Sequence, residues 1–199
     1  MNDRRVRISE DAREVEIAGP VHEGPALNHG QGKYIDTRVS IRVATPRDGE
    51  RLRRMFSRAS SETIYRRFHI PYPNVPEWML DRMLDVDHHD REALVAVAGE
   101  EIVGHAMYAR LTDDGDAEVA IAVEDGWQSK GVGKLLLLEL AERARLRGIE
   151  TFTGEVLGNN RRMLGLAAVF AETNYKMRDG LYHVRMPLRR TLEPRAPAA

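Results

Sequence analysis

The sequence has no cysteine among its 199 residues. That absence excludes disulfide bonds, thiolate nucleophiles and every zinc site that needs a cysteine ligand. It also excludes a covalent thioester between the protein and a transferred group. Any group-transfer chemistry must therefore be direct, or must pass through a weaker oxygen or nitrogen nucleophile.

The sequence also has no excess of positive or negative residues and no long apolar run. Lysine and arginine total 30, aspartate and glutamate total 31, and the formal net charge is −1. This balance gives no reason to expect nucleic acid as the main partner. The N-terminal "MNDRRVRISEDAREVEI" has no apolar signal region, and no stretch reaches transmembrane length. We expect a cytoplasmic protein without a membrane partner. Its oligomeric state is unknown from the sequence.

Composition divides the chain into three parts. Residues 1–37 include the glycine- and proline-rich "AGPVHEGPALNHGQGKYIDTR", which predicts an extended or partly ordered N-terminal arm. Residues 190–199 are expected to be a flexible tail. Hydrophobic residues make up 42% of the chain, which is enough for one packed domain over 38–189.

The hydrophobic pattern predicts an α/β fold (α+β, with a mixed sheet). From Val39 the expected order is one strand, three helices, three strands, then helix, strand, helix and a final strand. The last of these helices is expected to run through "NRRMLGLAAVFAET". Ser60 or Ser61 is expected to cap the second helix, and Gly148 to end a helix over about 131–147. The strand–helix–strand crossover over 117–157 requires two parallel strands, whereas the remaining pairs are antiparallel.

A glycine-rich segment, "QSKGVGK" at 128–134, directly precedes the leucine-rich helix. Its glycines let backbone N–H groups approach a pyrophosphate, and the helix start adds unpaired donors and a positive dipole end. A P-loop is excluded because Val132 stands where lysine is needed and Leu135 follows Lys134. The match to a dinucleotide-binding fingerprint is weak, because that pattern needs a third glycine at position 136, which is leucine here. The structural alternative is that the glycines only permit a tight turn before the helix and bind no phosphate.

The longer stretch "AEVAIAVEDGWQSKGVGKLLLLELAERARLRGI", together with "SSETIYRRFH" and "EVLGNNRRML", resembles the GNAT superfamily of N-acetyltransferases. Within it, these segments are most similar to the catalytic domain of the bacterial protein lysine acetyltransferases (Pat-type). The resemblance spans about 39–188. It implies the GNAT fold, in which the two parallel central strands splay apart between flanking helices, and it implies acetyl-CoA as co-substrate.

The resemblance also implies a three-part cofactor site. The pyrophosphate would lie on the backbone amides of 129–134, and the pantetheine amides would pair with the strand backbone at 121–123 like an added strand. Asn160 would form a hydrogen bond with the pantetheine arm from the opposite side. The expected cofactor-binding residues are Ile121, Ala122, Val123, Gln128, Ser129, Lys130, Gly131, Val132, Gly133, Lys134 and Asn160.

The candidate general base is Glu118. An amine acceptor must lose a proton before it attacks, because lysine has a pKa of about 10.4 in water. A nearby carboxylate that takes this proton contributes about 10²–10⁴ in rate. The resemblance places the base of the lysine acetyltransferases at Glu118, where we expect it to be buried beside apolar neighbours. A surface glutamate is the structural alternative, and Glu155 is the second candidate.

Other candidate groups receive weaker roles. Phe170 occupies the position where many superfamily members carry a tyrosine acid, so no general acid is assigned. Tyr175 is expected to take the packing role of the phenylalanine that the superfamily usually has after the last helix, and not to act as an acid. His88 and His89 lie in an acidic turn that we interpret as a solvated loop, and we predict no metal site. The helix in "SSETIYRRF" belongs to the segment used for acceptor selection in the superfamily, or is a plain amphipathic helix. It holds Glu62, Tyr65, Arg66 and Arg67.

The expected function is direct acetyl transfer from acetyl-CoA to the ε-amine of a protein lysine. The resemblance implies an acyl-CoA synthetase as one candidate partner. Two alternatives stay open: a small-amine or N-terminal acetyltransferase, and a non-catalytic domain that binds acetyl-CoA as a sensor. The presence of Glu118 favours an enzyme over the sensor.

Overall fold

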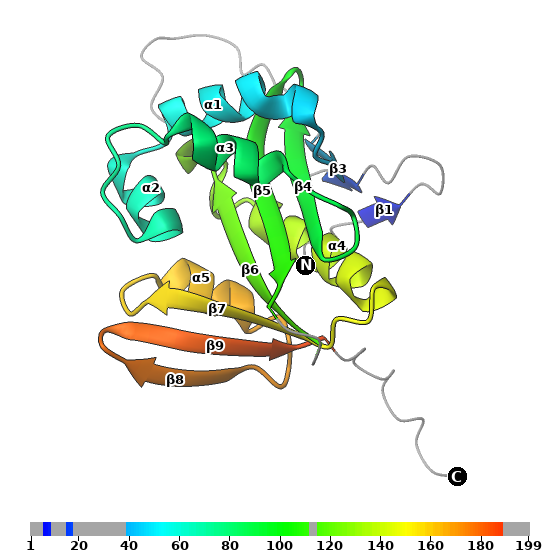
Figure 1. The fold of residues 1–199 in the computed structure, drawn as a ribbon, viewed down its shortest axis with the longest axis vertical. Helices are drawn as coiled ribbons and strands as arrows, with labels where there is room; N and C mark the ends of the chain where they lie inside the picture. Colours follow the sequence, from blue (N-terminus) through cyan, green and yellow to red (C-terminus); the bar gives the residue numbers. More distant parts are fainter. Residues whose placement is uncertain (1–5, 9–14, 18–38, 112–114, 189–199) are drawn as a thin grey trace, which may run out of the picture.

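The computed structural model describes residues 6–8, 15–17, 39–111 and 115–188 (Figure 1). Strands β1 (Val6–Ile8) and β2 (Val15–Ile17) pair antiparallel in a small sheet of their own. The other described strands form one seven-stranded sheet in the order β3-β4-β5-β6-β7-β9-β8.

Most of the expected arm, 1–37, and the whole expected tail, 190–199, lie outside the described residues.

The large sheet is mixed, as predicted. Among its described strands, β6 and β7 are the only parallel neighbours, and all other neighbours are antiparallel. Its strands are β3 (Val39–Val43), β4 (Arg91–Ala98), β5 (Glu101–Arg110), β6 (Asp116–Val123), β7 (Thr151–Leu157), β8 (Asn174–Arg178) and β9 (Leu181–Pro187).

The parallel strands part halfway along β6. Pairing joins Asp116–Glu118 to Thr151–Thr153 and then stops. Figure 1 shows β6 and β7 diverging beyond this point. Gly154 stands where they separate, and a Cβ there would lie 3.3 Å from the Val119 carbonyl oxygen, which is tighter than side chains usually tolerate. The splay predicted from the resemblance is therefore present, and glycine permits the close approach at its apex.

Helices cover both faces of the sheet. In Figure 1, α1 and α3 lie in front of β4 and β5, while α4 and α5 lie behind the sheet. The helices are α1 (Gly49–Arg58), α2 (Ser61–Phe68), α3 (Glu77–Leu84), α4 (Val132–Leu146) and α5 (Arg161–Ala167), with short 3₁₀ turns η1 (Pro46–Asp48) and η2 (Asp125–Trp127).

Two apolar clusters form the core, one on each face of the sheet. Leu94 of β4 packs in the cluster that holds the leucines of α4, whereas its neighbour Val95 packs in the cluster of α1 and α3. This alternation follows from the two-residue period of a strand that is buried on both faces. Leu136, Leu137 and Leu140 are fully buried, so α4 is fixed firmly behind the centre of the sheet.

Local signals at the helix ends match the predictions. Ser60 caps α2, because its side chain accepts from the Thr63 amide at 3.2 Å. Gly148 has φ +74° just after α4, a left-handed conformation that glycine adopts without a steric penalty.

The C-terminal elements differ from the prediction in two ways. The last helix ends at Ala167 instead of continuing through "VFAET", and strand β8 precedes the expected final strand. All five β8 residues are exposed, because β8 is an edge strand with an open face, and such a strand shows no apolar alternation. The overlooked signal was Asp179-Gly180, where both residues have positive φ in the tight turn to β9.

Candidate functional site

A cavity of about 810 Å³ opens where β6 and β7 part. Its wall is formed by α2, β6, the loop before α4, the first turn of α4, β7, α5 and β9. Residues of α2, near the start of the described domain, and of β9, near its end, therefore meet in one space, which lies where the pairing of β6 with β7 stops.

The glycine-rich segment forms one end of this cavity. Ser129 and Gly131 both have left-handed backbones, with φ +60° and +94°. Gly131 is the N-cap of α4, it provides no side-chain cap, and the first turn contains no acidic residue. The first amides of α4 therefore lack a side-chain acceptor, and together with the helix dipole they favour an anion at this end. At Gly133 a Cβ would lie 3.4 Å from Leu166 Cδ2, so this position is close to its neighbours but not overlapping them.

Most of the residues expected to bind cofactor line the cavity. Lys130 and Val132 do not: Lys130 Nζ lies 5.3 Å from the centre of the Trp127 ring, and the Val132 side chain is buried in the core. The expected residues in the lining are Ile121, Ala122, Val123, Gln128, Ser129, Gly131, Gly133, Lys134 and Asn160.

One edge of β6 faces the cavity. On its other edge β6 pairs with β5 as far as Val123, but on the β7 side pairing ends at Glu118. Gln128 closes the far end of this open edge, because its Nε2 donates to the Val123 carbonyl at 3.0 Å. Across the gap, Asn160 caps α5 by accepting from the Met163 amide at 3.2 Å. Its Oδ1 is thus engaged, and Asn160 also belongs to the cavity lining.

Two carboxylates line the cavity. Glu118 is exposed, so the expectation that it is buried beside apolar neighbours was wrong. The physical reason is the splay, because Glu118 is the last β6 residue paired to β7 and its side chain borders the opening. Glu155 lies farther along β7 and also lines the cavity, where its Oε1 is 3.3 Å from His183 Nδ1 on β9.

Helix α2 forms the opposite wall and is tied to the loop after β6. Asp125 accepts from the Ser60 amide at 2.8 Å, the Ser60 hydroxyl at 2.8 Å and the Thr63 hydroxyl at 2.9 Å. Burial alone would raise the pKa of Asp125, but these hydrogen bonds lower it below its usual value. Gln128 Nε2 also lies 2.9 Å from the Thr63 hydroxyl. The sequence pattern did not identify Asp125 or Thr63, since nothing local indicates that they meet.

Arg67, the penultimate residue of α2, brings a positive charge into the cavity wall. Its Nε is fully enclosed and has no hydrogen-bond partner. Burial lowers the pKa of Arg67 to about 10, although the negative charge of Glu118 opposes the shift. Burial, together with the charge of Arg67, lowers the pKa of His105 to about 3, so this buried histidine on β5 is neutral at physiological pH.

The two aromatic residues considered for acid catalysis lie outside the cavity lining. Phe170 is buried in the core behind the sheet. The Tyr175 hydroxyl donates to the Leu164 carbonyl at 3.2 Å, and its ring meets Tyr182 edge-on with centroids 6.3 Å apart. Tyr175 therefore has a packing role, as expected.

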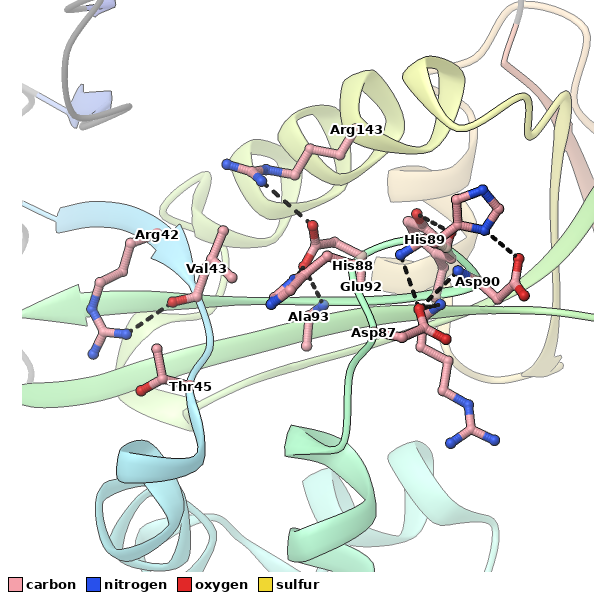
Figure 2. A network of polar contacts seen from close by, with 12 residues as sticks. Arg42, Val43, Thr45, Asp87, His88, His89, Asp90, Glu92, Ala93 and Arg143 are labelled. Carbon is pink, nitrogen blue, oxygen red and sulfur yellow. Dashed lines mark hydrogen bonds and ion pairs between the residues drawn. The ribbon is translucent and has the colours of Figure 1, made fainter.

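The histidine-containing turn belongs to a separate polar network. In Figure 2, His88 and His89 point to different acids: His88 Nδ1 lies 2.9 Å from Glu92, and His89 Nδ1 lies 2.9 Å from Asp90. The buried Glu92 is also 3.4 Å from Arg143 on α4. None of these residues lines the cavity. Within residues 39–111 and 115–188, no group of three or more acids and histidines is placed to hold a metal ion.

Comparison with known proteins identifies the class. The sequence matches the Acetyltransferase (GNAT) family over residues 52–170, and the chain belongs to that family. It is 30% identical over 132 residues to Acetyltransferase PA5475 of Pseudomonas aeruginosa, which covers 64% of this chain and 71% of that protein.

Pat-type proteins are also similar. Acetyltransferase Pat of Mycolicibacterium smegmatis is 32% identical over 127 residues, which is 62% of this chain but only 38% of that protein. The GNAT domain of S. lividans PAT superposes with a TM-score of 0.70 at 32% identity, covering 75% of this chain and 90% of that one.

A more distant structure shares the fold. It is yncA of Salmonella typhimurium, solved with its cofactor acetyl-CoA, which superposes with a TM-score of 0.61 at 19% identity over 81% of this chain and 98% of that one. Separately, no helix among the described residues is both long and apolar enough to cross a membrane.

Proposed function

We propose that this acetyltransferase moves the acetyl group of acetyl-CoA directly to the ε-amine of a lysine in a protein. The observation that carries the proposal is the single cavity in which an anion-attracting helix start, an open strand edge and Glu118 follow one another. The similarity to Pat-type acetyltransferases supports a protein acceptor, with an acyl-CoA synthetase as one candidate. A cytoplasmic location remains part of the proposal.

The cavity suggests how the co-substrate would lie. Its pyrophosphate would accept hydrogen bonds from the backbone amides around Gly131 and Gly133, where α4 begins. The pantetheine arm would then follow the open edge of β6, between that edge and the amide of Asn160. Such a path takes the thioester toward Glu118, at the apex of the splay.

The chemistry follows from this placement. An incoming lysine is an ammonium ion at neutral pH, and the Glu118 carboxylate would take one proton from it. The neutral nitrogen would then attack the thioester carbonyl carbon, the carbon–sulfur bond would break, and the coenzyme thiolate would take up the second proton that the nitrogen loses. Since the chain contains no cysteine to carry the acetyl group, the proposed route is direct transfer in a ternary complex of enzyme, acetyl-CoA and amine. Glu155 is the alternative base, but its carboxylate is already beside His183.

Thiol release from acetyl-CoA tests the proposal directly. Purified protein would be incubated with acetyl-CoA and one acceptor at a time: an acyl-CoA synthetase, a polyamine, a free amino acid, or a peptide with a free N-terminus. We expect the protein acceptor to give the highest turnover per unit concentration, with the acetyl group mapped to a lysine by mass spectrometry. Faster reaction with polyamines or amino acids would replace the protein-lysine assignment with a small-amine one. Binding of acetyl-CoA without release for any acceptor would indicate a sensor.

A further inference from the structure

Arg67 differs from Arg58 at the end of α1 and from Arg66 beside it on α2, because no carboxylate pairs with its charge. Arg66 pairs with Glu62 at 2.6 Å, and Arg58 pairs with Glu124 at 2.9 Å. Within the part of the chain that the structure describes, no hydrogen bond or ion pair involves Arg67. Its guanidinium carbon lies 4.9 Å from the centre of the Phe68 ring, a cation–π contact that offers no acceptor oxygen.

This arrangement is costly for a free protein. A charged group that leaves water loses its hydration, and folded proteins normally return that free energy through a counter-ion or hydrogen bonds. Glu118 interacts with Arg67 electrostatically but forms no ion pair with it, and His105 is neutral. Because Arg67 lines the cavity, an anionic group that enters the cavity could supply the missing partner.

The position of Arg67 limits what the other half can be. Arg67 and Glu118 line the same cavity, and Glu118 borders the opening where the thioester would meet the amine. A planar guanidinium presents paired N–H groups that match a carboxylate in a bidentate geometry. Arg67 interacts electrostatically with Glu118, whereas the glycine-rich segment begins at Gln128, which contacts Val123 at the other end of the open β6 edge. The co-substrate phosphates, which would lie at that far end, are therefore an unsuitable partner.

We propose that Arg67 binds a carboxylate carried by one of the two reactants, next to the reacting centre. The carboxylate could belong to the acceptor, as an acidic residue adjacent to the target lysine, or to the acyl group, as in a dicarboxylic acyl-CoA. The proposal rests on the acyl-transfer function proposed above. It adds that this site prefers an anionic reactant over a neutral one of the same shape.

Two matched pairs of ligands separate the two sources. Succinyl-CoA and butyryl-CoA differ by a terminal carboxylate in place of a methyl group, and calorimetry measures their binding without any acceptor. Two lysine peptides that differ only by glutamate or glutamine beside the lysine test the acceptor, with binding measured in the presence of CoA. We expect the anionic member of one pair to bind at least about tenfold tighter, as a charge-assisted hydrogen bond implies.

Three variants show whether Arg67 causes the preference. Arg67→Met removes the charge and should reduce the preference to less than about threefold. Arg67→Lys keeps the charge but lacks the paired N–H groups of a guanidinium, so it should retain part of the preference for the anionic ligand. Arg66→Met is the matched control, since it removes the neighbouring charge that Glu62 already compensates, and it should keep the full preference. Arg67→Met should also raise the thermal midpoint of the free protein by about 2–4 °C, because it removes an uncompensated charge.

The outcomes are distinguishable. Equal binding within both pairs by the wild-type protein, or a preference that survives Arg67→Met, would overturn the proposal. A lower thermal midpoint for both Arg67 variants would instead assign Arg67 a structural role. Absence of acetyl transfer to every amine would overturn the proposed function while leaving the succinyl-CoA comparison valid, because that comparison needs no turnover.

Discussion

The two walls of the cavity are built from different chemistry. The wall that would hold the coenzyme is mostly backbone: the open edge of β6 and the first amides of α4. The wall formed by α2 is mostly side chain, with Thr63, Arg66 and Arg67 facing the cavity. Backbone recognition requires only glycine and a break in pairing, and it suits a co-substrate that never changes. Side-chain recognition can vary from one protein to another on the same fold, which suits the choice of acceptor.

The largest expected effect lies on the backbone wall. Gly133→Asp adds a negative charge where the pyrophosphate would approach, and we expect acetyl-CoA affinity to fall by about 10³-fold in calorimetry. The fold should survive, since a Cβ at this position makes only a 3.4 Å contact with Leu166. Gly126→Asp is the matched control, because it adds the same charge in the same loop but outside the cavity lining. Equal loss in both variants would contradict the backbone site.

The next effect concerns the carboxylate between the two walls. Glu118→Gln should leave acetyl-CoA binding intact and lower turnover by about 10²-fold at pH 7.5. The deficit should shrink as pH rises, because more of the acceptor lysine is then already neutral. Glu155→Gln is the companion variant. If turnover falls with Glu155→Gln and stays near wild type with Glu118→Gln, the assigned base is the wrong one.

The buried His105, whose pKa is lowered by burial and by Arg67 of α2, should also make the stability of the fold sensitive to acid. The folded pKa of His105 is about 3, below its ordinary value of about 6.5, so between these values the unfolded chain holds a proton that the folded chain lacks. Stability is therefore full above about pH 6.5 and falls as pH drops, by about 2 kcal/mol from pH 6.5 to pH 5. His105→Gln should flatten this slope in urea titrations at several pH values, while its amide can still reach the Met83 carbonyl. An unchanged slope would show that His105 does not cause it.

The smallest expected effect is at Thr63, where α2 contacts the segment between β6 and α4. Thr63→Val removes the hydroxyl that contacts both Asp125 and Gln128. Loss of about 1 kcal/mol there should weaken acetyl-CoA binding by about threefold to tenfold, although Thr63 belongs to the acceptor wall. Ser57→Ala, which removes an exposed hydroxyl bonded only to Arg54, is the control. If Thr63→Val changes the affinity for the acceptor but not the affinity for acetyl-CoA, the prediction is wrong and the two walls bind their ligands independently.

The same contrast explains what the sequence could predict. The sequence predicted the strands and helices, the Ser60 cap and the helix end at Gly148, because each of these depends on neighbouring residues. The glycine spacing of 128–134 likewise indicated the backbone wall of the cavity. The burial of Glu118 was misjudged because it depends on where the pairing of β6 with β7 stops, which is a property of two distant segments. For the same reason the contacts of Asp125 with α2, and the unpaired charge of Arg67, could not be predicted from local pattern.

The splay of β6 from β7 also has a thermodynamic meaning. A sheet interrupted in this way leaves part of its hydrogen bonding for a ligand to supply, so the bound co-substrate would act as an additional strand of the native state. Binding to the native state alone adds about 2.7 kcal/mol of stability at a ligand concentration one hundred times the Kd. Backbone amides of β6 beyond Glu118 should then exchange with solvent deuterium more slowly in the complex than in the free chain. Such protection would make the supply of co-substrate a determinant of how long the folded protein persists.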